Sequence, residues 1–123
     1  MLDHVTIGVC DLGRSKAFYD QALKPLGVER LHAEGTDFAG YGRLEKAFFW
    51  IGLRPAAQTG VHIAFTAPDR ATVDRFHAAA LTAGGQDNGA PGLRPRYHPD
   101  YYGAFVIDPD GHNIEAVCHD PAG

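Results

Sequence analysis

Two segments of the chain, residues 2–27 and 60–85, repeat the same order of apolar and polar positions. Each starts with a short run of β-branched and apolar residues, which predicts a strand. An aspartate then stands where a helix N-cap is expected, apolar residues follow at helical spacing, and a glycine ends the pattern. The identical pairs are His4 and His62, Asp11 and Asp69, Phe18 and Phe76, Ala22 and Ala80, Leu23 and Leu81, and Gly27 and Gly85. Each segment is therefore predicted to form a strand followed by a capped helix.

The pattern after each predicted helix indicates further strands. A glycine- and proline-rich stretch precedes the last two strands, which flank the turn DPDG. The predicted strands are residues 28–35, 36–43 and 46–53 in the first half, and residues 102–108 and 112–117 in the second. We therefore expect an α+β fold of two βαβββ modules, at about residues 1–55 and 60–120, joined by a linker at 54–60. Together they form a single domain of residues 1–123.

Alternation along the strands places three ligand-type side chains on the faces that do not pack under helices. His4 and His62 alternate with apolar residues in the first strand of each module, and Glu115 alternates with Ile114 and Ala116 in the last strand. A carboxylate in such a buried run needs a partner or a metal. Two imidazoles and a carboxylate suit a divalent zinc, iron, manganese, cobalt or nickel ion. The alternative is that both histidines are ordinary surface or hydrogen-bonding residues.

Composition limits the other functions that the chain could have. With a net charge of −4 and no basic stripe, the chain lacks the pattern of a nucleic-acid-binding protein, and no apolar run is long enough to cross a membrane. The start of the chain lacks the pattern of a secretory signal, and Cys10 and Cys118 read as buried free thiols, so we expect a cytoplasmic protein. The only serine, Ser15, falls in a predicted first helical turn, and phosphate-binding glycine motifs are absent.

Residues 2–27, 61–65 and 101–117 resemble the vicinal oxygen chelate superfamily, which includes glyoxalase I, bleomycin-resistance proteins and extradiol dioxygenases. The resemblance covers nearly the whole chain. It implies that the paired modules form a curved mixed sheet around a metal-containing cavity, with the helices on the outer face. The superfamily builds this cavity either from two modules of one chain or from modules of two chains, so a homodimer is one expectation.

The resemblance also implies a metal site. Family ligands on the first strand of each module and on the last strand carry over to His4, His62 and Glu115. Members similar to glyoxalase I usually add a glutamate or glutamine on the strand that corresponds to residues 46–53, where this chain has Trp50. Because an indole cannot replace a carboxylate as an oxygen ligand, a glutathione-dependent glyoxalase I is disfavoured. The implied substrate chelates a divalent metal through neighbouring oxygens, and Glu115 is the candidate base.

Candidate substrate contacts come from strand alternation and from one unusual loop. Alternation places Phe48 and Trp50 on the cavity face as an aromatic wall, although ordinary core packing explains them equally well. The loop at residues 94–102 is rich in rings and cations, and it either covers the cavity or packs on the sheet. Its candidates are Arg96 and His98 for substrate binding, and Tyr101 and Tyr102 as hydrogen-bond donors to the substrate.

Three functions fit these expectations. The first is a metal-dependent, glyoxalase-related small-molecule enzyme of the lyase or isomerase type. The second is an iron-dependent extradiol-type dioxygenase, which uses the same triad but is disfavoured by the short chain. The third is a non-catalytic small-molecule or drug-binding protein that uses Trp50 and Phe48 without a metal.

Overall fold

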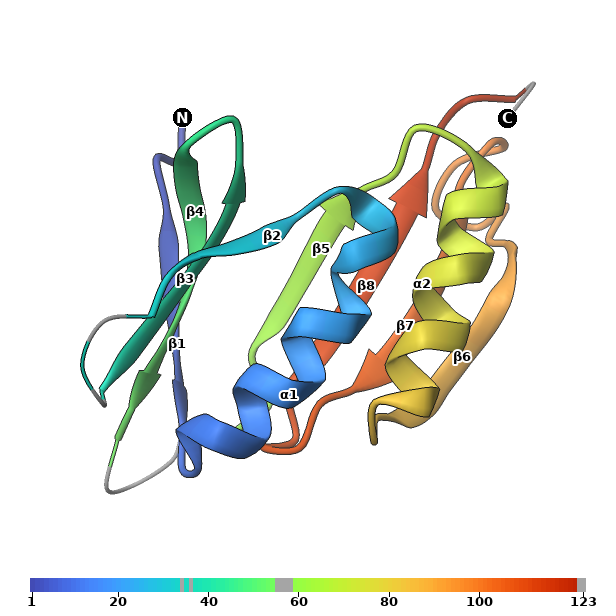
Figure 1. The fold of residues 1–123 in the computed structure, drawn as a ribbon. Coiled ribbons are helices and arrows are strands. Elements are labelled where there is room, and N and C mark those ends of the chain that lie inside the picture. Colours follow the sequence, from blue (N-terminus) through green and yellow to red (C-terminus); the bar gives the residue numbers. More distant parts are fainter. Residues whose placement is uncertain (34, 36, 55–58, 122–123) are drawn as a thin grey trace.

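The computed structural model describes residues 1–33, 35, 37–54 and 59–121, and its elements follow the same order in both halves of the chain (Figure 1). The first half contains β1 (Val5–Val9), α1 (Leu12–Ala22), the short 3-10 helix η1 (Lys24–Leu26), β2 (Glu29–His32), β3 (Phe38–Arg43) and β4 (Lys46–Leu53). The second half contains β5 (His62–Thr66), α2 (Arg70–Thr82), β6 (Gln86–Leu93), β7 (Tyr102–Ile107) and β8 (Asn113–Cys118). Most of the predicted linker at 54–60 lies outside the described residues.

Each half folds into its own four-stranded sheet with the same topology. The strand orders are β1-β4-β3-β2 and β5-β8-β7-β6. In each sheet the first strand lies parallel to the last strand of its module, and the other pairings are antiparallel. The predicted α+β fold of two βαβββ modules is therefore confirmed. The eight strands found among the described residues form two mixed sheets rather than one, with β1 and β5 each at an edge.

Side-chain capping starts both helices at the predicted aspartates. The carboxylates of Asp11 and Asp69 accept hydrogen bonds from backbone N–H groups in the first helical turn, at 3.0 and 2.7 Å. The end of α2 differs from the prediction, because Gly84 and not Gly85 adopts the left-handed conformation, with φ 104°. Gly85 is instead a close packing position, since a Cβ there would lie 2.4 Å from a methyl carbon of Val106.

The glycine- and proline-rich stretch forms the edge strand β6, for which the sequence showed no strand pattern. It pairs with β7 through a register that shifts on both sides of Gly89. Gly89 has a φ of 152°, a conformation that other residues rarely adopt. An edge position also tolerates Pro91, which cannot donate a backbone hydrogen bond. Irregular pairing at an edge therefore explains why the strand was missed.

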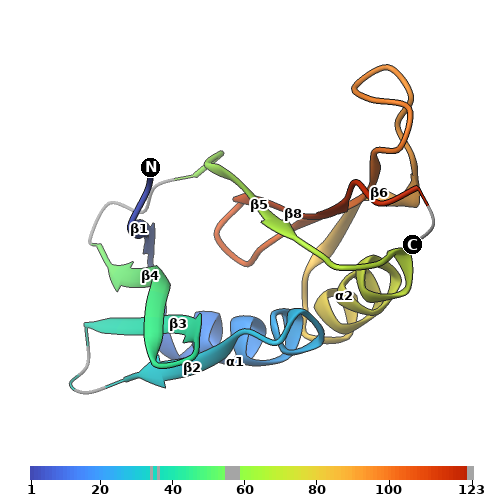
Figure 2. The same ribbon diagram turned by 90° about the horizontal axis from the view of Figure 1, so that it is seen from above.

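Both helices lie in the angle between the two sheets (Figure 2). Aromatic side chains fill part of this angle and connect the modules. Tyr19 of α1 contacts Phe49 of β4 with 5.1 Å between ring centroids, and Phe49 contacts Phe65 of β5 at 5.3 Å. All three residues are buried. Because the helices cover the inner faces, the open faces of the two sheets point away from each other.

The turn between β7 and β8 also joins the two modules. The carboxylate of Asp108 accepts hydrogen bonds from the backbone N–H groups of Asp110 and His112, both at 2.8 Å, and from the hydroxyl of Tyr19 at 2.5 Å. His112 is fully buried, and its Nε2 lies 2.9 Å from the carbonyl oxygen of Gly8 in β1. The turn thereby holds the start of β8 in a defined position against module one.

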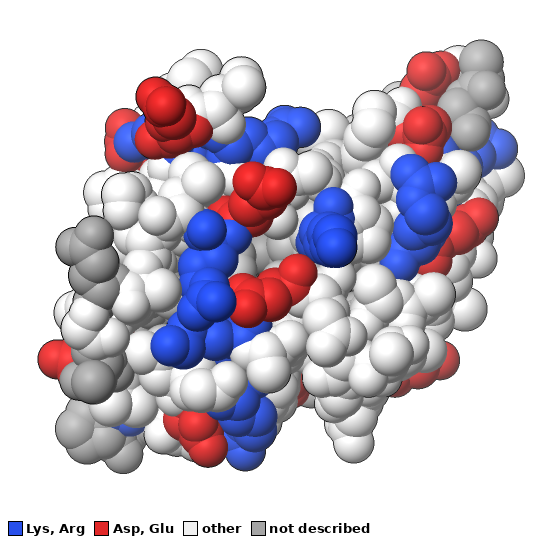
Figure 3. Space-filling view, in the orientation of Figure 1, with Lys and Arg blue, Asp and Glu red and all other residues white. Residues whose placement is uncertain are grey.

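The surface agrees in part with the expectations from composition. Basic and acidic side chains are interspersed on the face that carries the helices (Figure 3). Within the described part of the chain, no helix combines the length and apolar character needed to cross a bilayer. Cys118 is buried as predicted, whereas Cys10 is exposed because it follows the last residue of β1.

Candidate functional site

Two of the three predicted metal ligands meet on the open face of the second sheet. His62 opens β5, and Glu115 lies in the neighbouring parallel strand β8. Nε2 of His62 lies 2.9 Å from Oε1 of Glu115. The side chain of Glu115 is 2% exposed, whereas that of His62 is 47% exposed. The site therefore pairs a buried carboxylate with a half-open imidazole.

The hydroxyl of Tyr101 donates a hydrogen bond to the second carboxylate oxygen of Glu115, Oε2. Gly103 leaves room for this contact, because a Cβ there would lie 3.1 Å from both Oε2 of Glu115 and the ring of Tyr101. Burial, followed by the hydrogen bond to Glu115, raises the pKa of Tyr101 above its usual value. The phenol therefore stays protonated at neutral pH. The sequence suggested that Tyr101 donates to a bound substrate, but its partner in the structure is Glu115.

Asn113 contacts the other nitrogen of His62. Nδ2 of Asn113 lies 2.8 Å from Nδ1 of His62. With the amide donating to Nδ1, the imidazole carries its proton on Nε2 and donates to Glu115. The opposite amide orientation would accept a hydrogen bond from Nδ1–H and leave Nε2 free to bind a metal. Alternation along β8 already places Asn113 on the face of Glu115, which is the signal that could have identified this residue.

His4 does not reach the pair formed by His62 and Glu115. It immediately precedes β1, and its Nδ1 lies 2.8 Å from Oδ1 of Asp3, which also accepts a hydrogen bond from Nζ of Lys46 at 2.6 Å. These two hydrogen bonds, first that of Lys46 and then that of His4, lower the pKa of Asp3. Donation from Nδ1–H makes Nε2 of His4 the nitrogen that can bind a metal. No sequence signal identified Asp3 as its partner.

The residues of one chain fit a metal site in part. Imidazole nitrogen and carboxylate oxygen are suitable donors for zinc and for the other divalent transition metals. His62 and Glu115 supply one donor of each kind, and the buried carboxylate requires a partner there. Among the residues that the structure describes, no three His, Cys, Asp or Glu side chains gather closely enough to hold a metal ion. One chain thus carries the predicted ligand set in two separate parts.

Trp50 forms a ring stack on the open face of the first sheet. Its ring lies parallel to that of His32, with 5.6 Å between centroids and 7° between planes. Gly40 makes this arrangement possible, because a Cβ there would lie 2.7 Å from the indole ring. Trp50 pairs with Thr6 across the parallel strands, so the stack shares its face with the alternate residues of β1. The role of His32 was not visible in the sequence.

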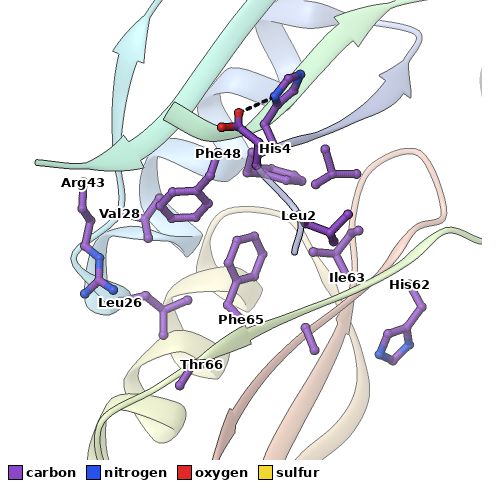
Figure 4. Close-up of a pocket in the computed structure, with 14 residues that line it drawn as sticks. Leu2, His4, Leu26, Val28, Arg43, Phe48, His62, Ile63, Phe65 and Thr66 are labelled. Carbon is purple, nitrogen blue, oxygen red and sulfur yellow. Dashed lines mark hydrogen bonds and ion pairs between the residues drawn. The ribbon is translucent and has the colours of Figure 1, made fainter. Parts of the chain in front are cut away.

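Phe48 does not share a wall with Trp50, contrary to the prediction from alternation. Phe48 is the extra residue of a bulge between β4 and β3, because its neighbours on both sides have pairing partners. The bulge interrupts the alternation, and Phe48 and Phe49 both line one cavity. Figure 4 shows Phe48 pointing into this cavity beside Val28.

This cavity has a volume of about 520 Å³ and lies between the two sheets, on their helical side (Figure 4). Ile63 and Phe65 of β5 point into it, whereas His62 borders it from the other side of the strand. The size is typical of a ligand pocket. Neither Glu115 nor Tyr101 is among the described residues that line it. The cavity therefore adjoins the site around Glu115 through His62, and His4 also lines it.

The remaining loop candidates have other partners than Glu115 among the contacts of the described residues. The hydroxyl of Tyr102 donates a hydrogen bond to Asp74 of α2 at 2.6 Å, on the helical side of the sheet. Arg96 stacks on the tyrosine that follows it, and His98 accepts a backbone hydrogen bond within the loop. Of the four predicted loop residues, Tyr101 is the one that the structure brings to Glu115.

Comparisons with known proteins agree with this architecture. The Glyoxalase/Bleomycin resistance protein/Dioxygenase superfamily model matches residues 1–116. Among solved structures, a glyoxalase/bleomycin resistance protein from Albidiferax ferrireducens T118 is 33% identical with a TM-score of 0.80, and the match covers 96% of this chain and 98% of that chain. The comparison with curated proteins gives no match.

Two further structures share the fold at lower identity. A glyoxalase-related enzyme from Fulvimarina pelagi is 20% identical with a TM-score of 0.75, and the match covers 96% of this chain and 87% of that chain. A glyoxalase/bleomycin resistance protein/dioxygenase family enzyme from Burkholderia phytofirmans PsJN is 17% identical with a TM-score of 0.73, and the match covers 96% of this chain and 98% of that chain. At these identities the likeness concerns the fold alone. Given the family match over residues 1–116, the chain belongs to the Glyoxalase/Bleomycin resistance protein/Dioxygenase superfamily.

Proposed function

We propose that the protein is a metal-dependent small-molecule enzyme of the glyoxalase-related lyase or isomerase type, active as a homodimer. In this proposal each site combines His62 and Glu115 of one chain with His4 of the second chain. The observation that carries the proposal is the 2.9 Å contact between His62 and the buried carboxylate of Glu115. A buried carboxylate is costly without a cationic partner, and an adjacent imidazole supplies a second donor for a divalent ion.

The surroundings of His4 support its role as a ligand from a second chain. Asp3 accepts the hydrogen bond from Nδ1 of His4, and metal-ligating histidines commonly make such a contact with a carboxylate. His4 immediately precedes β1, in the module whose sheet has its open face pointing away from that of the second sheet. In a dimer with a twofold axis, His4 of each chain would lie beside His62 and Glu115 of the other chain, which forms two equivalent sites.

The chemistry divides among the ion and the residues of this chain. A bound divalent ion supplies Lewis acidity to a substrate that holds it through two neighbouring oxygens. Glu115 is the candidate to accept a proton from the substrate, because it is the carboxylate at this site and its Oε2 is held in place by Tyr101. Trp50, stacked on His32, offers an apolar wall for the carbon skeleton of the substrate.

Metal analysis of protein purified without chelators tests this proposal. We expect stoichiometric metal in the wild type and its loss in His62→Ala and in His4→Ala. His77→Ala is the matched control, because His77 forms a similar 2.9 Å contact with Asp87, which lies at the start of β6. The proposal fails if wild type and His62→Ala retain equal amounts of metal, or if neither binds any after incubation with zinc, iron, manganese, cobalt or nickel.

A second candidate function is non-catalytic binding of a flat organic molecule, favoured by the stack of Trp50 on His32. The indole is held parallel to a second ring and is half-buried, which suits stacking of a ligand. Trp50 is the only tryptophan, so its fluorescence reports on this position. Binding that changes the fluorescence equally before and after chelator treatment would favour this function over the metal-dependent one.

A further inference from the structure

We propose that Tyr101 is a positioning residue for Glu115. By holding Oε2, it leaves Oε1 as the single carboxylate oxygen that faces His62 and a bound ion. The relevance to catalysis rests on the function proposed above. The contact between Tyr101 and Glu115 is present without an ion, so it can be tested separately.

Tyr101 is held from several sides, so its hydroxyl has a defined position. Its backbone N–H donates to the carbonyl oxygen of His98 at 3.1 Å, and its own carbonyl oxygen accepts from the N–H of Arg94 at 2.7 Å. The ring packs edge-on against Tyr97 and His119, with centroid distances of 5.1 and 5.2 Å. A donor that is ordered before a ligand arrives loses little entropy when it acts.

The strand beside Glu115 is shaped for the same contact. Gly103 follows Tyr101 by two residues in β7, and Gly103 pairs with Val117 in β8. A methyl group at Gly103 would approach both Oε2 of Glu115 and the tyrosine ring at 3.1 Å, closer than ordinary contact. The absence of a side chain at Gly103 therefore lets the carboxylate and the phenol meet.

The two oxygens of Glu115 consequently have different partners. Tyr101 binds Oε2, and Nε2 of His62 lies against Oε1. A carboxylate with two free oxygens can bind an ion through either or both of them. A carboxylate with one oxygen held by a fixed phenol has a defined orientation, and its other oxygen is the one more available to an ion. Tyr101 therefore determines how Glu115 presents its ligand atom.

Tyr101→Phe removes the donor, and Tyr97→Phe is the matched control because its hydroxyl contacts Arg96 in the same loop. Infrared difference spectra of the metal-free proteins, with Glu115→Gln identifying the band, should show a shifted Glu115 carboxylate stretch in Tyr101→Phe. No shift is expected in Tyr97→Phe. If the Glu115 carboxylate stretch of Tyr101→Phe has the same frequency as in wild type, the inference is overturned.

Zinc supplies the second readout. Competition with a chromophoric chelator should show zinc affinity about tenfold or more weaker in Tyr101→Phe than in wild type, the usual scale for removing a residue that orients a ligand. In the zinc-bound Tyr101→Phe variant, the frequency difference between the symmetric and antisymmetric carboxylate stretches of Glu115 should also be smaller than in wild type, because both oxygens become available to zinc. Unchanged affinity and separation would overturn the inference and leave the proposed function intact.

Gly103→Ala provides an independent variant. The added methyl group should separate the phenol from Oε2 and reproduce the infrared shift of Tyr101→Phe while retaining both functional groups. A wild-type spectrum in this variant would count against the inference. If wild type binds none of zinc, iron, manganese, cobalt and nickel, the proposed function fails, and the metal-free spectra still decide whether Tyr101 positions Glu115.

Discussion

Mixing two defective variants tests whether the site is built from two chains. His4→Ala retains the pair of His62 and Glu115, whereas His62→Ala retains His4. In a mixed dimer, one site would combine the intact His4 of one chain with the intact pair of the other. The second site of that dimer would lack both histidines. Neither variant alone should bind stoichiometric metal.

The expected recovery follows from this arrangement. Equal mixing with free subunit exchange makes about half of the dimers mixed, and each mixed dimer has one intact site of two, so about one quarter of the wild-type metal content should return. A site formed within one chain predicts no recovery, because every chain in the mixture lacks one ligand. The two arrangements therefore differ in a quantity that metal analysis resolves.

The assay exchanges subunits of differently tagged variants and measures metal per chain, first in the whole mixture and then in the isolated mixed dimers, where one intact site of two makes the expected content about half that of wild type. A mixture of His62→Ala with Glu115→Ala is the control, because both changes affect the same half-site and no mixed dimer can be complete. Recovery in the control equal to that in the test mixture would refute the reasoning. The absence of metal from isolated mixed dimers of His4→Ala and His62→Ala would also refute it.

Two further predictions concern the fold and the orientation of His62. Tyr19→Phe should lower the free energy of unfolding by about 1.5–3 kcal/mol, because it leaves a buried oxygen of Asp108 without its donor. The hydroxyl of Tyr41 donates to a partly exposed aspartate of α1. Tyr41→Phe should therefore lower the free energy of unfolding by about 1 kcal/mol or less, since water can replace the contact. Urea unfolding at one fixed protein concentration compares the two variants. Equal losses of unfolding free energy would contradict the larger contribution assigned to the buried hydrogen bond of Tyr19. Asn113→Asp should strengthen zinc binding in the chelator competition, because a carboxylate accepts a hydrogen bond from Nδ1–H of His62 and favours a free Nε2; weaker or unchanged binding would argue against this role of Asn113.

Features that depend on neighbouring residues were predictable from the sequence. Asp11 and Asp69 cap the helices because a carboxylate can reach the backbone of the next turn without help from the rest of the fold. Alternation along β5 and β8 placed His62 and Glu115 on the faces that do not pack under helices, and the structure makes the two strands neighbours. Local regularity was sufficient for these features.

Irregular local structure was not predictable. The bulge at Phe48 separates it from Trp50 in the alternation, and a bulge depends on how β4 pairs with β3 rather than on the pattern of β4 alone. The role of Tyr101 likewise required the structure, because its hydroxyl meets Glu115 only where the loop returns beside β8. Gly103 matters because it has no side chain between Glu115 and Tyr101, and the sequence does not show that space is needed there.

By itself, the sequence determined the two modules, the caps of their helices and the shared face of His62 and Glu115. Only the tertiary structure decided the directions in which the open faces of the two sheets point. Packing of the helices in the angle between the sheets, together with the contact of Tyr19 and Asp108, orients one module against the other. Strand alternation specifies a face relative to its own sheet, whereas the relation between two sheets depends on contacts between distant residues. For this reason His62 and Glu115 meet within the chain, while His4 hydrogen-bonds to Asp3 instead.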